Sequence, residues 1–286
     1  MKKHNFTDKH PILSSIITGI VLMFFCQLLS GIMTFIGYML LGERSDLITL
    51  TSTVFATILC LLLYRFRYRP DFKGVTFDGD LKKGILMILL PLTVYWIVNG
   101  IAMAFEGSLQ PKPLTLSIIT TSVTAGFVEE LSFRHGVIST MFKNLNKQED
   151  ILKICLISSA FFGLFHALNI FAGADPLQTA IQVVAAGCHG VLFAAAFMAC
   201  GNLWPSILFH TVHDIVAITI TASVAENGIV SGAVSPAVFI DLITSILVAV
   251  FAVRCYLAPQ HRQAIASLWQ KKWNKKEILP VNKEEE

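Results

Sequence analysis

The sequence has 286 residues, of which 54% are hydrophobic and only 14% are charged, and its mean hydropathy is +0.66. Soluble domains carry about 25% charged residues, so this composition excludes a soluble globular protein and indicates a membrane protein. The formal net charge of +3 is too small to indicate a nucleic-acid partner. The six cysteines form no C-x-x-C pair, which argues against a disulfide framework or a zinc ribbon.

Eight apolar stretches are long enough to cross a bilayer, which takes about 20 residues per helix. The first is uncharged from Pro11 to Gly42, too long for a signal peptide, so we expect it to be retained as a span. The uncharged stretch 176–212 is too long for one span and is divided at Gly201, Asn202 and Pro205. In chain order the expected spans are 11–41, 47–64, 84–105, 114–142, 154–171, 176–200, 203–222 and 238–256. The predicted fold is all-α, a polytopic membrane protein with about eight transmembrane helices.

The lysines and arginines are distributed very unevenly between the two ends of these spans. If the N-terminus is cytoplasmic, nineteen of the 22 fall in inner segments, and only Arg44 and Lys112 fall in outer loops. Because cytoplasmic loops are enriched in Lys and Arg, we predict a multi-pass protein of the cell membrane with both termini in the cytoplasm. The polar tail 260–286 contains Trp269 and Trp273, which indicate either a basic helix resting on lipid headgroups or an ordinary snorkelling tail.

Three charged residues lie inside the fourth expected span, where each costs about 2.5–3.5 kcal/mol at the bilayer centre. Glu130 and Arg134 are four residues apart, hence neighbours on one helix face, and are expected to form a structural ion pair. Glu129 points about 100° away from Glu130 on an α-helix. We therefore expect Glu129 to be the free carboxylate.

Histidines and a further carboxylate occur in two other spans. His166 lies in the fifth span, and His210 and Asp214 lie four residues apart in the seventh. The crossing directions put these groups and Glu129 at similar depth, so the site is expected between helices four, five and seven. A carboxylate beside imidazoles is suited to deprotonating a water, or to binding a metal that does so.

At these residues the sequence resembles the CPBP group of intramembrane proteases, also called the CAAX prenyl endopeptidase or Abi family. The family pattern is E-E-x-x-x-R, then F-x-x-x-H, then H-x-x-x-N/D, on three membrane helices. Here the three motifs are Glu129 to Arg134, Phe162 to His166, and His210 to Asp214. The resemblance covers roughly residues 115–220, and we divide the chain into a three-span region 1–113, a protease core 114–222, and a last span with tail 223–286. His135 stands where many members have Gly, a departure expected to alter the cavity wall.

The resemblance implies hydrolysis of a peptide bond within or beside the membrane. By the chemistry proposed for the family, Glu129 is the general base and His166 helps to hold the attacking water. His210 and Asp214 position the scissile carbonyl and stabilise the oxyanion. We expect no obligatory cofactor, because no H-E-x-x-H helix is present; zinc stays possible, and its ligands would be Glu129, His166 and His210.

Two other function classes stay open, a transporter or proton relay and a scaffold of the same fold that binds membrane partners without cutting them. The expected partners are membrane lipid and a peptide or membrane-protein precursor, with no nucleic acid; the sequence names neither the substrate, nor whether it is prenylated, nor the oligomeric state. His189 and His213 are more simply interhelical hydrogen-bond partners. Asp241 is interpreted as interfacial and Phe162 as a packing residue.

Overall fold

The computed structural model describes residues 6–42, 44–68, 72, 77–221 and 234–273. These residues form helices and no β-strand; their one β-type pairing is an isolated antiparallel β-bridge between Leu109 and Thr221. The helices are α1 (Phe6–Lys9), α2 (Pro11–Leu41), α3 (Asp46–Leu63), η1 (Tyr64–Tyr68), α4 (Leu81–Glu106), α5 (Leu116–Glu129), η2 (Glu130–Ile138), α6 (Ser139–Met141), α7 (Asp150–Phe165), η3 (His166–Ala172), α8 (Pro176–Cys200), α9 (Trp204–Ile220), α10 (Pro236–Tyr256) and α11 (Pro259–Lys272). The predicted all-α, polytopic architecture is confirmed.

Within the described residues, six helical segments are long and apolar enough to cross a membrane. They are Pro11–Leu41, Asp46–Phe66, Leu81–Glu106, Asp150–Ala172, Pro176–Cys200 and Pro236–Tyr256. The expected fourth span is instead divided into α5, the π-helix η2 and α6, and α9 in the expected seventh span has 17 residues. The exact number of eight spans therefore stays a prediction.

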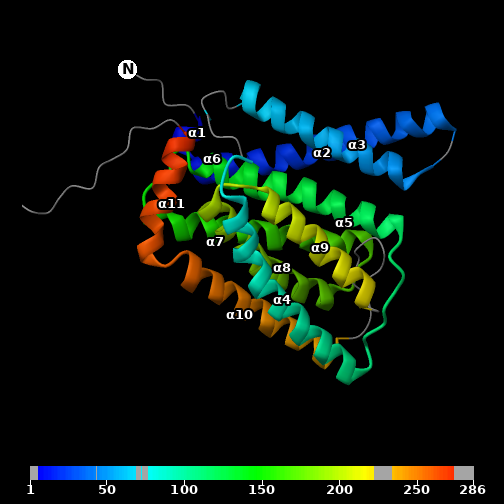
Figure 1. Ribbon diagram of the computed structural model, residues 1–286. Helices are drawn as coiled ribbons and strands as arrows, with labels where there is room; N and C mark the ends of the chain where they lie inside the picture. Colours follow the sequence, from blue (N-terminus) through cyan, green and yellow to red (C-terminus); the bar gives the residue numbers. More distant parts are fainter. Residues whose placement is uncertain (1–5, 43, 69–71, 73–76, 222–233, 274–286) are drawn as a thin grey trace, which may run out of the picture.

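Helix α8 is the central helix of the bundle. It is the most buried of the six apolar helices, with 67% of its most apolar window buried, and it packs against α4, α7, α9, α10 and η3. Figure 1 shows α2 and α3 lying together on the side of α5, where α2 also packs against η2. The motif-bearing segments η2, α7, η3 and α9 therefore all pack against α8.

Glycines allow these helices to approach closely. A Cβ at Gly163 of α7 would lie 2.5 Å from the backbone carbonyl oxygen of Val183 in α8. A Cβ at Gly126 of α5 would overlap the hydroxyl of Thr211 in α9. Small residues at such crossings let membrane helices pack backbone to backbone, and here they bring α7 against α8 and α5 against α9.

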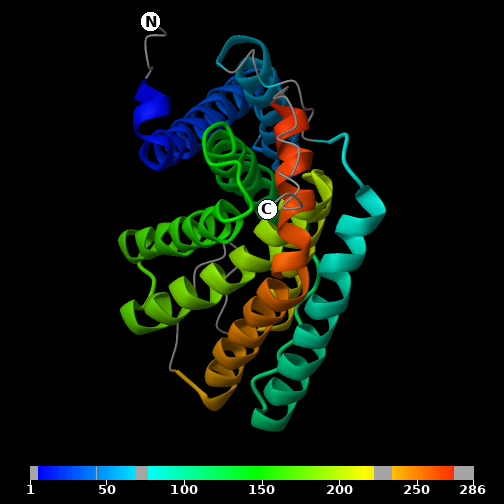
Figure 2. The same cartoon turned by 90° about the vertical axis from the view of Figure 1, so that its left-hand side faces the viewer.

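Helix α11 closes one end of the bundle. The Trp269 indole Nε1 donates to the Met198 carbonyl at 3.0 Å, and its ring stacks on Phe142 with centroids 4.5 Å apart. The Trp273 Nε1 donates to the Ser139 carbonyl at 3.0 Å. Both indoles are buried in the protein, so the headgroup and snorkelling interpretations are wrong for these two residues; residues 274–286 of the tail lie outside the described part. Figures 1 and 2 show α11 crossing the same end at which α1 lies.

Candidate active site

The first motif lies where the helix changes type. Glu129 is the last residue of α5 and Glu130 the first of the π-helix η2, a form that recurs at functional sites. Glu130 and Arg134 are fully buried, with the arginine Nε 3.2 Å from the Glu130 Oε2. The Arg134 guanidinium also lies 4.5 Å from the centroid of the Phe162 ring. Phe162 is therefore more than a packing residue, because its ring makes a cation–π contact with the buried Arg134.

His210 joins this pair to the other carboxylates. Its Nδ1 lies 2.9 Å from the Glu130 Oε1, at hydrogen-bond distance. Because an ionised carboxylate only accepts hydrogen bonds, Nδ1 carries the proton. Its Nε2 faces Glu129 Oε2 at 3.7 Å and Asp214 Oδ2 at 3.6 Å, distances too long for direct hydrogen bonds. Glu130 thus has a second partner besides Arg134, one that its spacing in the sequence did not reveal.

Glu129 differs from Glu130 in its surroundings. Its side chain is 24% exposed, against 0% for Glu130. Its Oε2 atom is buried and has no hydrogen-bond partner among the described residues. The structure therefore leaves on Glu129 a carboxylate oxygen with an unused lone pair.

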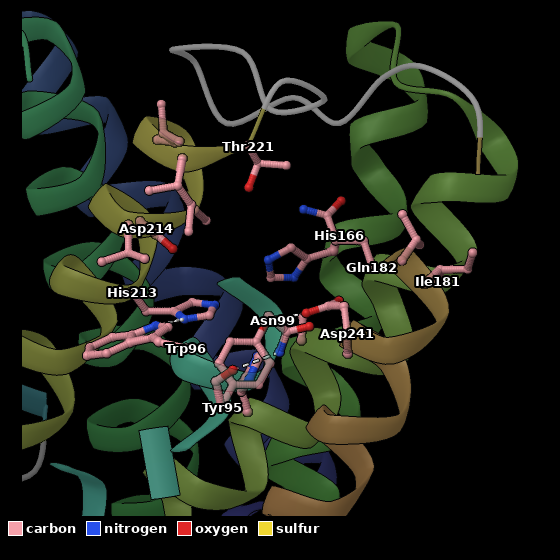
Figure 3. Close-up of a pocket in the computed structure, with 18 of the residues that line it drawn as sticks. Tyr95, Trp96, Asn99, His166, Ile181, Gln182, His213, Asp214, Thr221 and Asp241 are labelled. Atoms are coloured by element: carbon pink, nitrogen blue, oxygen red, sulfur yellow. Dashed lines mark hydrogen bonds between the residues drawn. The ribbon is translucent and has the colours of Figure 1, made fainter. Parts of the chain in front are cut away.

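His166 begins the 3₁₀ helix η3, directly after α7. Its Nδ1 lies 3.0 Å from the carbonyl oxygen of Phe162, one turn earlier. Because a carbonyl only accepts, Nδ1 is the donor and the neutral ring keeps Nε2 as an acceptor. Figure 3 shows the His166 ring projecting into a cavity.

The four residues expected to act on substrate, Glu129, His166, His210 and Asp214, all line this cavity, which has a volume of about 480 Å³. Glu130 and Arg134 are not among its lining residues. The sequence predicted that the fourth, fifth and seventh expected spans form the walls of the site. The third, sixth and eighth expected spans, which are α4, α8 and α10, also contribute lining residues. Lining residues from these three helices include Tyr95, Trp96, Asn99, Gln178, Gln182, His189 and Asp241.

The cavity contains a second cluster of polar side chains, which the sequence did not predict. The Tyr95 hydroxyl donates to the Asp241 carboxylate, and the Trp96 Nε1 donates to the His213 Nδ1 at 3.2 Å (Figure 3). The His189 ring lies 4.5 Å from that of His213. Asp241 is therefore not merely interfacial, and its position as a carboxylate in an apolar span was the signal available.

The expectation for His135 is wrong. Its ring lies 4.3 Å from that of Tyr64 and does not line the cavity. The π-helix η2 places it on the side facing η1.

The arrangement does not form a ready metal site. Zinc takes ligands at about 2.0–2.3 Å, and no group of three or more His, Cys, Asp or Glu side chains that could hold a metal occurs in the part of the chain that the structure describes. The His210 Nδ1 is bonded to Glu130 and the His166 Nδ1 to a backbone carbonyl. Glu129, His166 and His210 thus stay a hypothetical zinc set, and no chemical step is derived through a metal.

Comparison with known protein families gives a match to the segment that contains the three motifs. Residues 111–216 match the family model described as Rce1-like, type II CAAX prenyl endopeptidase Rce1-like. No curated protein matches the sequence. All seven motif residues lie within the matched segment, whereas Tyr95 and Asp241 lie outside it. The match covers 106 of the 286 residues and, for this segment, confirms the resemblance to the CPBP family.

Proposed function

We propose that the protein is an intramembrane endopeptidase in which Glu129 activates a water to hydrolyse a peptide bond of a membrane-associated peptide or protein precursor. The observation that carries the proposal is the unpartnered Oε2 of Glu129, which faces the His210 Nε2 on the wall of a cavity of about 480 Å³. A general base must have a free lone pair and access to substrate. Glu129 lines the cavity, whereas Glu130 is fully buried outside it and its two oxygens face Arg134 and His210 at 3.2 and 2.9 Å.

In the proposed reaction, a water donates one hydrogen bond to Glu129 and the other to the acceptor Nε2 of His166. Glu129 takes a proton as the water oxygen attacks the scissile carbonyl carbon. The same proton then passes from Glu129 to the leaving amine as the carbon–nitrogen bond breaks. The products are a carboxylic acid and an amine, and no covalent enzyme intermediate forms.

His210 and Asp214 are proposed to stabilise the oxyanion and to position the carbonyl. Donation to an oxyanion requires a proton on the His210 Nε2. The carboxylates of Glu129 and Asp214, 3.7 and 3.6 Å from that nitrogen, would stabilise such a proton. Glu130 fixes the opposite ring nitrogen at 2.9 Å, so the imidazole is oriented before substrate binds.

A comparison of membrane and secreted peptides tests this proposal in cells. Cells with the wild-type gene, without the gene, and with Glu129→Gln are compared by mass spectrometry for an uncut precursor. We expect the precursor to accumulate in the last two. The control is Glu149→Gln, because Glu149 is an exposed carboxylate paired only loosely with Lys147 at 3.6 Å, and this variant should process the precursor normally. Normal cellular function of Glu129→Gln, with no precursor in any strain, would instead favour a scaffold.

A further inference from the structure

The cavity lies toward one end of the bundle, the end distant from α11 (Figure 1). On α9 its lining residues run from His210 to Thr221, and on α4 from Tyr95 to Met103. On α8 they run from Gln178 to Phe193. Residues 81–94 of α4, 194–200 of α8 and 204–209 of α9, which lie toward α11, contribute none of the lining residues.

Packed side chains block the end nearer α11. The rings of Phe193 and Phe197 are buried, and Phe197 meets Trp269 with centroids 5.2 Å apart. Trp269 in turn bonds to the end of α8. These packed rings separate His210 from α11.

At the other end, the lining extends past the helix ends to three half-buried residues, Ser108 after α4, Thr221 after α9 and Ser235 before α10. The connections around this rim are held together by direct bonds. The Gln110 backbone N–H donates to the Ile220 carbonyl at 3.0 Å, and the Ser235 hydroxyl donates to Glu106 at 2.8 Å. We call Ser108, Thr221 and Ser235 the rim.

The Lys and Arg residues give the rim a direction in the membrane. The rim lies at the end of α4, beside the connection that contains Lys112, and the α2–α3 connection with Arg44 lies at this same end. Most of the other Lys and Arg residues that the structure describes lie beside helix ends near α11: they are Lys9, Arg65, Lys82, Lys83, Lys143, Lys147, Lys153, Arg254, Arg262, Lys271 and Lys272. By the positive-inside rule the α11 end is cytoplasmic, and the rim faces away from the cytoplasm.

We propose that the cavity takes its substrate from the non-cytoplasmic side of the membrane, as a neutral or basic peptide segment. That the occupant is a substrate rests on the proposed function, whereas the direction of access does not. The lining residues include the carboxyl groups of Glu129, Asp214 and Asp241 and no Lys or Arg, so an acidic segment would find no Lys or Arg counter-charge. A prenylated C-terminus of a cytosolic protein would meet the closed end.

Cysteine accessibility tests the direction without any need for cleavage. In the full chain with Cys188→Ala and Cys255→Ser, single cysteines are introduced by Ala217→Cys in the cavity and by Gln263→Cys on exposed α11. Spheroplasts are treated with a small membrane-impermeant methanethiosulfonate before or after permeabilisation. A lipid-facing control is Leu247→Cys, whose side chain is 60% exposed on α10.

We expect Ala217→Cys to react in intact spheroplasts, Gln263→Cys to react only after permeabilisation, and Leu247→Cys to react in neither. The reverse pattern for the first two would overturn the proposal. Failure of Ala217→Cys to react from either side, in protein with unchanged thermal unfolding, would overturn it as well. Labelling from outside combined with no proteolysis in any strain would leave the direction intact and refute the proposed function, so the two failures are distinguishable.

Discussion

Among the single residues of the site, Glu130 has the most demanding position, because its two oxygens serve two partners. One lies 3.2 Å from the Arg134 Nε and the other 2.9 Å from the His210 Nδ1. We predict that Glu130→Gln lowers the free energy of unfolding by about 3–5 kcal/mol, since it leaves a buried arginine without its counter-charge. Thermal unfolding of the purified variant in detergent checks this, with Glu129→Gln as the matched neighbour, for which we expect little change. Equal unfolding of the two variants would contradict the division of roles.

The absence of a ready three-ligand metal group among the described residues leads to a second prediction at this scale. We expect peptide cleavage by the purified protein to persist after dialysis against a strong chelator, because the proposed base and donors are protein side chains. The measurement is the cleavage rate before dialysis, after dialysis, and after zinc is added back. Loss of activity with recovery by zinc would show that Glu129, His166 and His210 rearrange to bind the metal.

Residue spacing predicted only the contacts that lie within one helix. Glu130 and Arg134 are neighbours because they are four apart, which can be read directly from the sequence. The contact between Glu130 and His210 spans eighty positions and depends on how α5 and η2 pack against α9. No periodicity in either segment encodes that crossing, so the second partner of Glu130 could not be predicted.

At the scale of helices, the close approach of α7 to α8 determines where His166 lies. We predict that Gly163→Ala lowers the free energy of unfolding by about 1–3 kcal/mol, because its Cβ would lie 2.5 Å from the Val183 carbonyl, which is backbone and cannot swing away. Cleavage should fall in addition, since His166 follows three residues later. The matched control is Gly100→Ala in α4, where nothing lies within 4 Å. A fully active and stable Gly163→Ala protein would show that this crossing does not set the site.

Changes of helix type were also beyond the sequence. The motifs were interpreted on ideal α-helices, whereas Glu130 begins a π-helix and His166 a 3₁₀ helix. Such local changes of helix type arise from tertiary packing, which routinely overrides intrinsic helix propensity. His135, whose ring lies 4.3 Å from that of Tyr64, belongs to this π-helix.

For the whole molecule, α11 is expected to contribute to stability, although the sequence suggested a peripheral tail. We predict that Trp269→Ala lowers the free energy of unfolding by about 3–5 kcal/mol, because it removes a fully buried ring and leaves a cavity. The control is His261→Ala on the exposed face of the same helix, which should unfold like wild type. Equal unfolding temperatures for the two variants would indicate that α11 is not part of the packed bundle.

The cavity illustrates how far motifs alone can describe a site. The four residues expected to meet substrate lie in the matched segment 111–216, and they were found because buried charges in apolar spans demand an explanation. The opposite wall comes from α4 and α10, whose Tyr95 and Asp241 lie outside any motif. The proposed division at 113/114 and 222/223 thus separates residues that share one cavity, and it stays a prediction.

The central claim is that Glu129 is the catalytic base, and the most direct test is the cleavage rate of purified Glu129→Gln protein on the precursor identified in cells. Glutamine keeps the volume of glutamate but cannot take a proton from water. The account predicts a rate roughly 10²- to 10⁴-fold below wild type, with unchanged thermal unfolding. Wild-type cleavage by the folded Glu129→Gln protein would contradict it.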